Sequence, residues 1–476
     1  MTHHLTEVPL VSLPTERFAA VMDPPRYAEL VEVADGARQR FAGRVVWNVS
    51  STARGGGVAE MLASLLSYTR GAGVDARWAV IAGTPPFFAL TKRLHNRLHG
   101  RPGDDGPLGD QERRIYAATL EGNAAELAER VRSEDIVLLH DPQTLGLAAP
   151  LKALGATVVW RCHIGLDEPN DLARDAWAFL EPFAGAADAY VFSRAAYVWT
   201  GLDLDRTTII RPGIDPLSAK NQHLDADTVS GILHACGLLD GQSAPAAPAF
   251  ARMDDSPGRV DRAAWVREDR PLGNADRLVT QISRWDSLKD PAGVMRAFID
   301  GIAPASDAHL LLAGPAVEGV TDDPEGGEVL ASCLAFRESV APEVRARIHL
   351  ACLPMRDVEE NAAIVNALQR QSALVVQKSL AEGFGLTVAE AMWKARPVVA
   401  SAVGGIRDQI VDGQSGVLVD PADLKGFAAA VLRLLADDEA ARALGAAAHE
   451  RVGDEFLAPR QLTDHVRLLS TLDPRR

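Results

Sequence analysis

The feature that most constrains the fold is an alternation of short apolar runs with stretches of helical periodicity. In the first half of the chain, runs typical of buried strands lie at 44–49, 76–81, 136–139, 157–160 and 189–192. In the second half, runs of the same kind lie at 278–282, 309–312, 347–350, 373–376 and 397–400. Strands that alternate with helices form parallel sheets with right-handed crossovers. We therefore predict an α/β protein with two Rossmann-like βαβ lobes that face each other across a cleft.

The segments around these runs give the expected domain boundaries. Residues 1–40 are interrupted by prolines and are expected to form an N-terminal extension. The expected first lobe is 41–215, the second lobe is 216–455, and residues 456–476 form a helix that packs back on the body. Within the second lobe, 240–275 is rich in turn formers and is expected to be an irregular insertion. Helical spacing is seen at 58–70, 427–436, 438–452 and 457–472.

Composition excludes several classes of protein. The 476 residues carry a formal net charge of −15, which argues against general binding to nucleic acid or to an anionic membrane but allows a local basic pocket. The 4 cysteines form no CxxC pair, so we expect reduced, mostly buried thiols. Neither a leader-like N-terminus nor an apolar run of about 18 residues is present, and a soluble, cytoplasmic protein is expected. The sequence has no HExxH and no DxD beside a strand, so no metal site is predicted.

A glycine-rich turn joins the first predicted strand to the first predicted helix. Gly55, Gly56 and Gly57 would let the backbone approach a ligand, and the following helix would present free amides to an anion or a sugar. A tight structural turn explains these glycines equally well, because the pattern is not GxGxxG.

Two cations follow the predicted strand 278–282. Arg284 and Lys289 would lie at its carboxyl end, where open α/β sheets bind ligands. A guanidinium fork together with a lysine point charge suits a diphosphate. The alternative is a solvated pair of surface cations.

A third motif follows the predicted strand 373–376 and contains two carboxylates. Gly383 and Gly385 would allow an irregular backbone, and the helix expected after them would direct its dipole at the same place. Glu382 precedes that helix and Glu390 lies about one turn inside it, so the two need not contact the same group. One could hold sugar hydroxyls and the other a ribose diol. The alternatives are a loop or cap carboxylate and a solvent-exposed helix residue.

Three further motifs place polar groups at strand ends or near the lobe junction. They are His140-Asp-Pro-Gln143, Arg161-Cys-His163-Ile-Gly165, and the loop from Arg211 to Asn221. The structural alternatives are a turn aspartate, a partly buried capping histidine and a linker, respectively.

The combination of Arg284, Lys289 and Glu382-x7-Glu390 in an EGFG context resembles the retaining glycosyltransferases of family four, which have the GT-B architecture. The stretches STARGGGVAEML, HDPQ, WRCHIG, RPGIDPLSAKN and EGFGLTVAEAMWK narrow the resemblance to the trehalose synthases that join a nucleotide-diphosphate glucose to glucose. The retaining trehalose phosphorylases are close relatives of these enzymes. The resemblance runs from about residue 44 to about residue 455.

This resemblance implies a nucleotide-sugar site in the second lobe and an acceptor site in the first. Arg284 and Lys289 would hold the diphosphate, Glu390 the ribose and Glu382 the transferred glucose. The other donor-binding residues that it implies are Gly56, Gly57, Gly383, Phe384, Gly385, Leu386 and Thr387.

On the acceptor side the resemblance implies Asp141, His163 and Arg211, and His163 joins Glu382, Arg284 and Lys289 as a catalytic residue. It further implies a front-face mechanism that retains configuration and forms an α,α-1,1 bond, with the departing phosphate accepting the acceptor's proton. The protein then supplies charge stabilisation and positioning. The sequence differs from the family pattern at Gly165, where the family often has an aspartate. Asp167, two residues further on, could take the place of that aspartate.

We therefore expect a hexosyltransferase whose partners are a sugar and a UDP-, ADP- or GDP-glucose. No cofactor, essential metal, nucleic acid or membrane is expected, and a homodimer rests on the family alone. The alternatives are a retaining trehalose phosphorylase, a family-four transferase with another sugar acceptor, and an inactive sugar- or nucleotide-binding regulator.

Overall fold

The computed structural model describes residues 4–53, 56–240, 247–317 and 324–472. The chain divides into two compact units, the first comprising 1–213 with 458–476 and the second comprising 214–457. These boundaries lie within two residues of the expected divisions at 215/216 and 455/456. Both units are α/β structures, as predicted from the alternation of strands and helices.

Unit 1 is built on a sheet with the strand order β1-β3-β2-β4-β5-β6-β7. Its strands are β1 (Thr6–Val8), β2 (Val45–Ser50), β3 (Asp75–Val80), β4 (Ile136–His140), β5 (Thr157–Cys162), β6 (Ala189–Phe192) and β7 (Thr207–Ile209). Its helices are α1 (Pro24–Arg40), α2 (Gly57–Gly71), α3 (Pro85–Leu98), α4 (Asp110–Ala128), α5 (Ala148–Ala153), α6 (Asp171–Ala184) and α16 (Ala458–Thr471). Every residue of β2 and β4 is buried, because a parallel sheet is covered on both faces.

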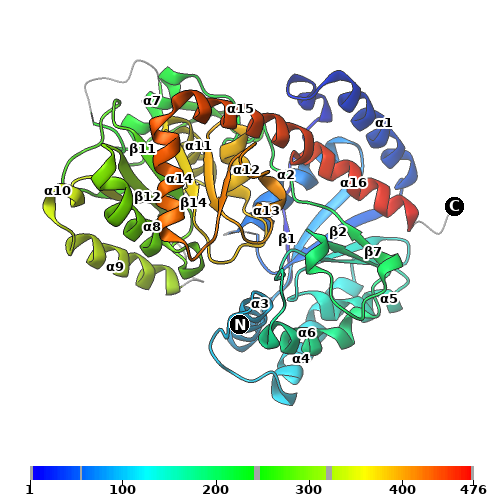
Figure 1. The fold of residues 1–476 in the computed structure, drawn as a ribbon. Coiled ribbons are helices and arrows are strands. Elements are labelled where there is room, and N and C mark those ends of the chain that lie inside the picture. The colour runs from blue at the N-terminus through cyan, green and yellow to red at the C-terminus, as the bar shows by residue number, and fades with distance from the viewer. Residues whose placement is uncertain (1–3, 54–55, 241–246, 318–323, 473–476) are drawn as a thin grey trace. The chain divides into compact units, whose positions relative to one another are not determined.

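Residues 1–40, expected to be an extension, are integral to unit 1. Strand β1 pairs antiparallel with β3 at the edge of the sheet, and α1 packs against α16 (Figure 1). The prolines that favoured an irregular segment instead begin α1, since Pro24 and Pro25 occupy the first turn, where no backbone N–H is needed. Asp23 caps this helix by accepting a hydrogen bond from the Arg26 amide at 3.1 Å.

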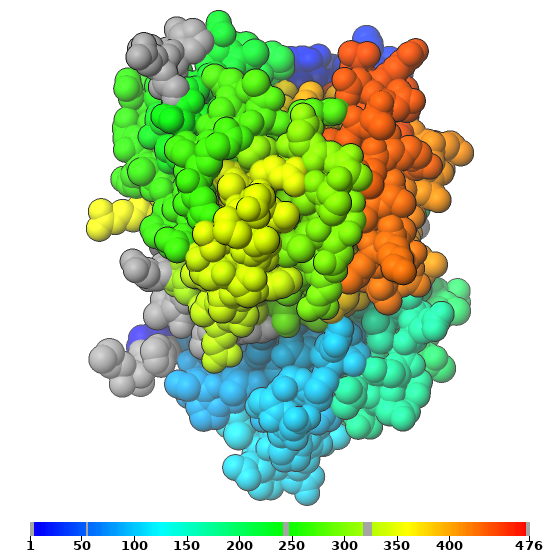
Figure 2. All heavy atoms as spheres, turned by 60° about the vertical axis from the view of Figure 1, so that its left-hand side comes forward, coloured from blue at the N-terminus to red at the C-terminus, as the bar shows by residue number. Residues whose placement is uncertain are grey.

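Unit 2 is built on a sheet with the order β10-β13-β12-β11-β14-β15-β16. Its strands are β10 (Trp265–Arg267), β11 (Leu278–Ile282), β12 (His309–Pro315), β13 (Ile348–Leu353), β14 (Leu374–Gln377), β15 (Val398–Ser401) and β16 (Val417–Val419). Its helices are α7 (Ala226–Ala235), α8 (Pro291–Ala297), α9 (Pro324–Glu338), α10 (Pro342–Arg345), α11 (Val358–Gln371), α12 (Leu386–Trp393), α13 (Ile406–Gln409), α14 (Leu424–Ala436) and α15 (Asp438–Glu455). Helices α8 and α14 pack together, and in Figure 2 the orange segment that includes α14 lies beside the yellow-green part of unit 2.

The segment 240–275, expected to be an irregular insertion, contains short strands between its turns and loops, and 241–246 lie outside the described residues. Strands β8 (Ala249–Ala251) and β9 (Pro257–Arg259) form a hairpin, and β10 adds an antiparallel edge strand beside β13. Each of these strands has only 3 residues, which is too short to show a periodicity.

The chain after β10 adds charged side chains to two buried histidines at one end of the second sheet. His309 Nδ1 lies 3.0 Å from His349 Nε2, and His349 Nδ1 lies 2.9 Å from Glu268 Oε2. Arg270 NH2 lies 2.8 Å from His309 Nε2, and Asp276 Oδ1 lies 3.7 Å from the same nitrogen. Burial lowers the pKa of His309 to about 4, against the opposing charge of Asp276.

We expect this cluster to make the protein sensitive to acid. Between pH 6.5 and 4 the unfolded chain binds a proton at His309 that the folded chain does not, so stability falls as the pH falls. Urea unfolding of wild type and His309→Gln over this pH range measures the effect. The free energy of unfolding should depend less steeply on pH in His309→Gln than in wild type, with slopes that differ by up to about 1.4 kcal/mol per pH unit. Parallel slopes for the two proteins would contradict the assignment.

All 4 cysteines are free and buried, as predicted. In the described part of the chain, no helix combines the length and the apolar character needed to cross a membrane.

Candidate functional site

The two predicted charged loops of unit 2 meet in an ion pair. Lys289 ends the short helix η5 (Ser287–Lys289) after β11, and Glu382 follows β14, its parallel neighbour in the sheet. Lys289 Nζ lies 2.6 Å from Glu382 Oε2, and the two side chains are only 15% and 12% exposed. The Ser379 hydroxyl also donates to Glu382 Oε2, at 3.0 Å. The carboxyl end of the second sheet therefore holds a shielded cation and carboxylate, as the motifs predicted.

A buried polar layer lies beneath this pair and joins the same two loops. The Gln281 side chain donates to the Lys289 carbonyl at 2.8 Å and accepts from the Lys378 amide at 2.9 Å. The ammonium of Lys378 contacts the Asp290 carboxylate and donates to the Pro421 carbonyl at 2.9 Å. Because Lys378 is 1% exposed, its charge is compensated inside the protein. These contacts join the loop that carries Lys289 to the loop that carries Glu382 and so fix the positions of the two side chains.

The glycines of the second loop fix its path. Gly385 has φ of +85°, in the left-handed region, and a Cβ there would lie 3.0 Å from Ile406 Cγ1. A Cβ on Gly405 would lie 2.6 Å from the Cα of Phe384. The Gln409 side chain donates to the Phe384 carbonyl at 2.6 Å. The backbone of 383–385 is thus held tightly where α12 begins, with Leu386 and Thr387 in its first turn.

Glu390 lies inside α12 and is 2% exposed, which excludes the alternative of a solvent-exposed helix residue. Its Oε1 lies 3.7 Å from Lys220 Nζ. Its cationic partner therefore differs from that of Glu382, which pairs with Lys289.

Arg284 is placed differently from Lys289. It donates to Asp286 Oδ2 at 3.2 Å and keeps 44% of its side chain exposed. Asp286 also caps η5 by accepting from the Leu288 amide at 2.8 Å. Arg284 therefore keeps guanidinium surface that a ligand can reach, whereas Lys289 is largely covered.

In unit 1, Asp141 joins the ends of two strands. It has φ of +63°, and its Oδ1 accepts a hydrogen bond from the His163 amide at 2.7 Å. Its carbonyl oxygen accepts from Trp160 Nε1 at 3.1 Å. Burial raises the pKa of Asp141 to about 7, against the lowering effect of the His163 amide. One carboxylate oxygen of Asp141 therefore positions the backbone of His163, a role that the motif did not reveal.

His163 is buried and lies in a row with two other polar side chains. Its Nε2 lies 3.2 Å from Nδ1 of His140, whose Nε2 lies 2.9 Å from Asn48 Oδ1. Burial lowers the pKa of His163 well below its usual value and that of His140 to about 3. A capping role for His163 is not what these contacts show.

The remaining predicted residues of unit 1 lie at its loops. Gly56 is the N-cap of α2 and Gly57 is the first residue of that helix. A Cβ on Gly56 would meet nothing within 4 Å. Gly55 lies outside the described residues. The partly buried Arg211 accepts at its carbonyl from Arg460 NH2 at 2.5 Å.

Gly165 is the position where the sequence differs from the family pattern. The ring of Tyr197 occupies the space beside it, since a Cβ on Gly165 would lie 2.2 Å from Tyr197 Cγ. Asp167 Oδ1 accepts from Arg194 NH1 at 2.6 Å. Asp167 is therefore engaged in an ion pair of its own.

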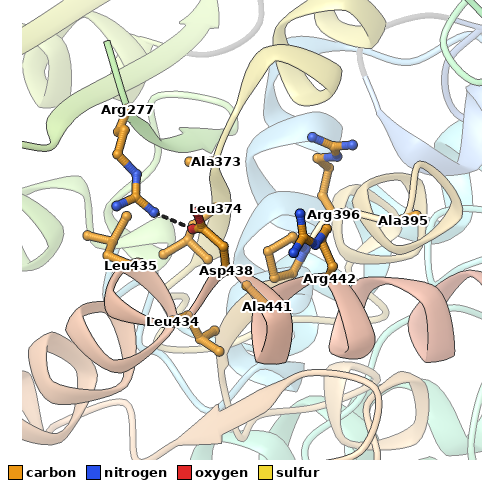
Figure 3. A pocket seen from close by; sticks show the side chains of 11 residues that line it. Arg277, Ala373, Leu374, Ala395, Arg396, Leu434, Leu435, Asp438, Ala441 and Arg442 are labelled. Atoms are coloured by element: carbon orange, nitrogen blue, oxygen red, sulfur yellow. Dashed lines mark hydrogen bonds and ion pairs between the residues drawn. The ribbon is translucent and has the colours of Figure 1, made fainter. Parts of the chain in front are cut away.

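A hollow of about 220 Å³ in unit 2 lies at the other end of the sheet (Figure 3). It is lined by the residues that begin β14 and precede β11 and β15, and so lies at the amino ends of the strands. Two of its arginines have structural partners: Arg277 pairs with Asp438 at 2.8 Å, and Arg396 NH1 donates to the Arg370 carbonyl at 3.1 Å. We therefore place the candidate site at the carboxyl ends.

Several supporting residues were missed by sequence reasoning. They are Gln281, Asp290, Lys378 and Ser379 in unit 2, and Asn48 in unit 1. A signal existed for Gln281 and Lys378, which are polar residues at the carboxyl ends of apolar strands. His140 belongs to a motif that was placed at a strand end, but its contacts with Asn48 and His163 were not predicted. In the described residues, no group of three or more His, Cys, Asp or Glu side chains could hold a metal ion.

Comparison with known proteins identifies the family of the chain. Residues 48–199 match the family model "Trehalose synthase, N-terminal domain", and 358–451 match "Glycosyl transferases group 1". The chain is 36% identical to a trehalose synthase of Rubrobacter xylanophilus over 94% of each chain. A trehalose phosphorylase of Pleurotus pulmonarius is 25% identical over 92% of this chain and 58% of that protein. Among solved structures, a trehalose 6-phosphate synthase from Burkholderia multivorans covers 90% of this chain and 98% of that one, with a TM-score of 0.65 and 17% identity.

The fold and these matches define a glycosyltransferase of the GT-B fold. Within this class, the sequence identity to the Rubrobacter enzyme extends over nearly the whole of both chains and so indicates one family. The chain belongs to the trehalose synthase family.

Proposed function

We propose that this protein transfers glucose from a nucleotide-diphosphate glucose to glucose with retention, and so forms α,α-1,1 trehalose. The observation that carries the proposal is the Lys289–Glu382 pair, 2.6 Å apart at the carboxyl end of the second sheet. A cation and a carboxylate in one shielded place suit a substrate that joins a diphosphate to a hydroxyl-rich sugar.

In the proposed reaction the C1–O bond to the diphosphate breaks as the 1-hydroxyl of the acceptor forms a new bond to C1 on the same face. The proton of that hydroxyl passes to the departing phosphate oxygen, and the products are trehalose and a nucleoside diphosphate. Lys289 and Arg284 stabilise the charge that develops on the diphosphate, and Glu382 accepts hydrogen bonds from the transferred sugar. Glu390 takes the ribose hydroxyls.

Asp141, His163 and Arg211 belong to the acceptor side of this proposal, whereas Gly56 and Gly57 at the start of α2 belong to the donor side. The buried, neutral His163 acts in it by hydrogen bonding rather than as an acid. No metal or cofactor takes part, because the cations and the dipole of α12 neutralise the leaving group.

A phosphorylase is the second candidate, favoured by the similarity to the Pleurotus enzyme. Inorganic phosphate would then take the place of the nucleotide diphosphate beside Lys289. The same cation would serve both reactions, so only the substrates separate them.

Release of nucleoside diphosphate distinguishes these functions. The protein is incubated with UDP-, ADP- or GDP-glucose, with and without glucose, and in parallel with trehalose plus phosphate. We expect glucose-dependent release from at least one donor and no glucose 1-phosphate from trehalose. Formation of glucose 1-phosphate without any nucleotide release would establish the phosphorylase instead.

A further inference from the structure

Three polar side chains form a buried row in unit 1. Asn48 comes from β2, His140 ends β4, and His163 directly follows β5. They are 2%, 3% and 9% exposed, respectively. The centroids of the two imidazole rings are 5.5 Å apart and their planes differ by only 15°, as an in-plane contact between ring nitrogens requires. The sheet therefore supports the whole row on neighbouring strands.

The contacts along the row fix where each proton lies. Asn48 Oδ1 can only accept, so His140 Nε2 carries a hydrogen and donates it across 2.9 Å. A neutral His140 then has a lone pair on Nδ1, which lies 3.2 Å from His163 Nε2. His163 must donate from Nε2 and is left with a lone pair on Nδ1.

The surroundings keep both rings neutral. Burial is the main cause of their lowered pKa values, and the Arg161 guanidinium adds a like charge. The buried His465 lies against Arg161 and further disfavours a charge on His163. A doubly protonated His140 would have no lone pair to offer, so the row needs this neutrality.

We propose that Asn48 and His140 are positioning residues that hold His163 in the Nε2–H tautomer, with Nδ1 presented as an acceptor to a hydroxyl group of the sugar substrate. Within the described residues, Nδ1 of His163 has no hydrogen-bond partner of its own. Asp141 fixes the backbone of the same residue through its 2.7 Å contact with the His163 amide. His163 is thus held both at its backbone and at one ring nitrogen. The inference rests on the proposed function, because that function supplies the sugar hydroxyl.

The tautomer can be read without any activity. Long-range ¹H–¹⁵N spectra of protein labelled in histidine, recorded at pH 8, distinguish a protonated from an unprotonated ring nitrogen, and Asn48 and His140 variants assign the signals. We expect His163 to be protonated at Nε2 and unprotonated at Nδ1. Asn48→Asp should keep this pattern, because a carboxylate also only accepts. A proton on Nδ1 of His163, or a reversal in Asn48→Asp, would overturn the proposal.

A matched pair of variants tests the positioning itself. His140→Phe fills the space without an acceptor, whereas His140→Gln offers an amide oxygen to His163 Nε2. We expect His140→Phe to lower kcat/KM by about 10²-fold, the usual cost of misplacing a contact group, and His140→Gln to recover most of it. Equal kcat/KM values for two variants with wild-type thermal midpoints would refute a positioning role. If the variants have lower thermal midpoints than wild type, the ¹H–¹⁵N spectra decide whether the proposal holds.

Failure of this proposal and failure of the proposed function have different signatures. If no sugar product forms but the spectra show the expected tautomer, the function is wrong and the hydrogen-bonded row stands. If trehalose forms while His163 has the opposite tautomer, the function stands and the role of Asn48 and His140 is wrong.

Discussion

Replacing Glu382 by glutamine is expected to lower kcat by about 10²- to 10³-fold while leaving the fold intact. Its carboxylate is 12% exposed and lies 2.6 Å from Lys289, so it acts in a shielded place where one lost charge partner has this effect. Lys289→Met should cost a similar factor. Initial rates at saturating donor and acceptor measure both.

The design of this experiment uses the contact between the two side chains. Because Glu382 and Lys289 touch each other, the double variant should lose much less than the product of the single losses. Glu343→Gln, which changes an exposed glutamate of α10, serves as the control for loss of one negative charge. Near wild-type turnover in Glu382→Gln would exclude the role assigned to this carboxylate.

Asp290→Asn is expected to destabilise the protein by about 3–5 kcal/mol, the usual cost of leaving a buried charge without its partner. Lys378 is 1% exposed, and the variant removes the carboxylate that its ammonium contacts. Asparagine tolerates the left-handed backbone at this position, where φ is +47°, so the change isolates the charge. Urea unfolding measures the loss, and kcat should fall as well because these residues hold the loop of Lys289.

Two controls make the interpretation of this variant specific. Asp438→Asn removes the exposed partner of Arg277 and should cost less than about 1 kcal/mol. Adding Lys378→Met to Asp290→Asn should restore much of the stability, because the uncompensated charge is then gone. An unfolding free energy for Asp290→Asn within about 1 kcal/mol of wild type would show that water already solvates Lys378.

The sequence predicted the main strands of both sheets because each of them is a continuous apolar run. Each predicted strand corresponds to an observed one, for example 278–282 to β11 and 189–192 to β6. The strands that were missed, β1, β7, β8, β9, β10 and β16, have 3 residues each. Such strands are defined by pairing with a neighbour rather than by a pattern of their own.

The motifs located Lys289 and Glu382 shortly after apolar strands, and the structure shows that these strands are parallel neighbours. Their ion pair was not predicted, because the motifs do not show which strands are adjacent. The supporting contacts of Gln281 and Asp141 depend on which loops meet, and that information is long-range. Asp141 was expected to meet a sugar, yet one of its oxygens is already bonded to the His163 amide.

The most direct test of the proposed function is the linkage of the product. The protein is incubated with glucose and the donor that releases its nucleotide, and the disaccharide is analysed by proton NMR. We predict a single non-reducing disaccharide with one set of anomeric signals, whose small coupling identifies the α configuration at both anomeric carbons. A reducing disaccharide, or a β anomeric coupling, would contradict the proposal that this protein forms α,α-1,1 trehalose with retention.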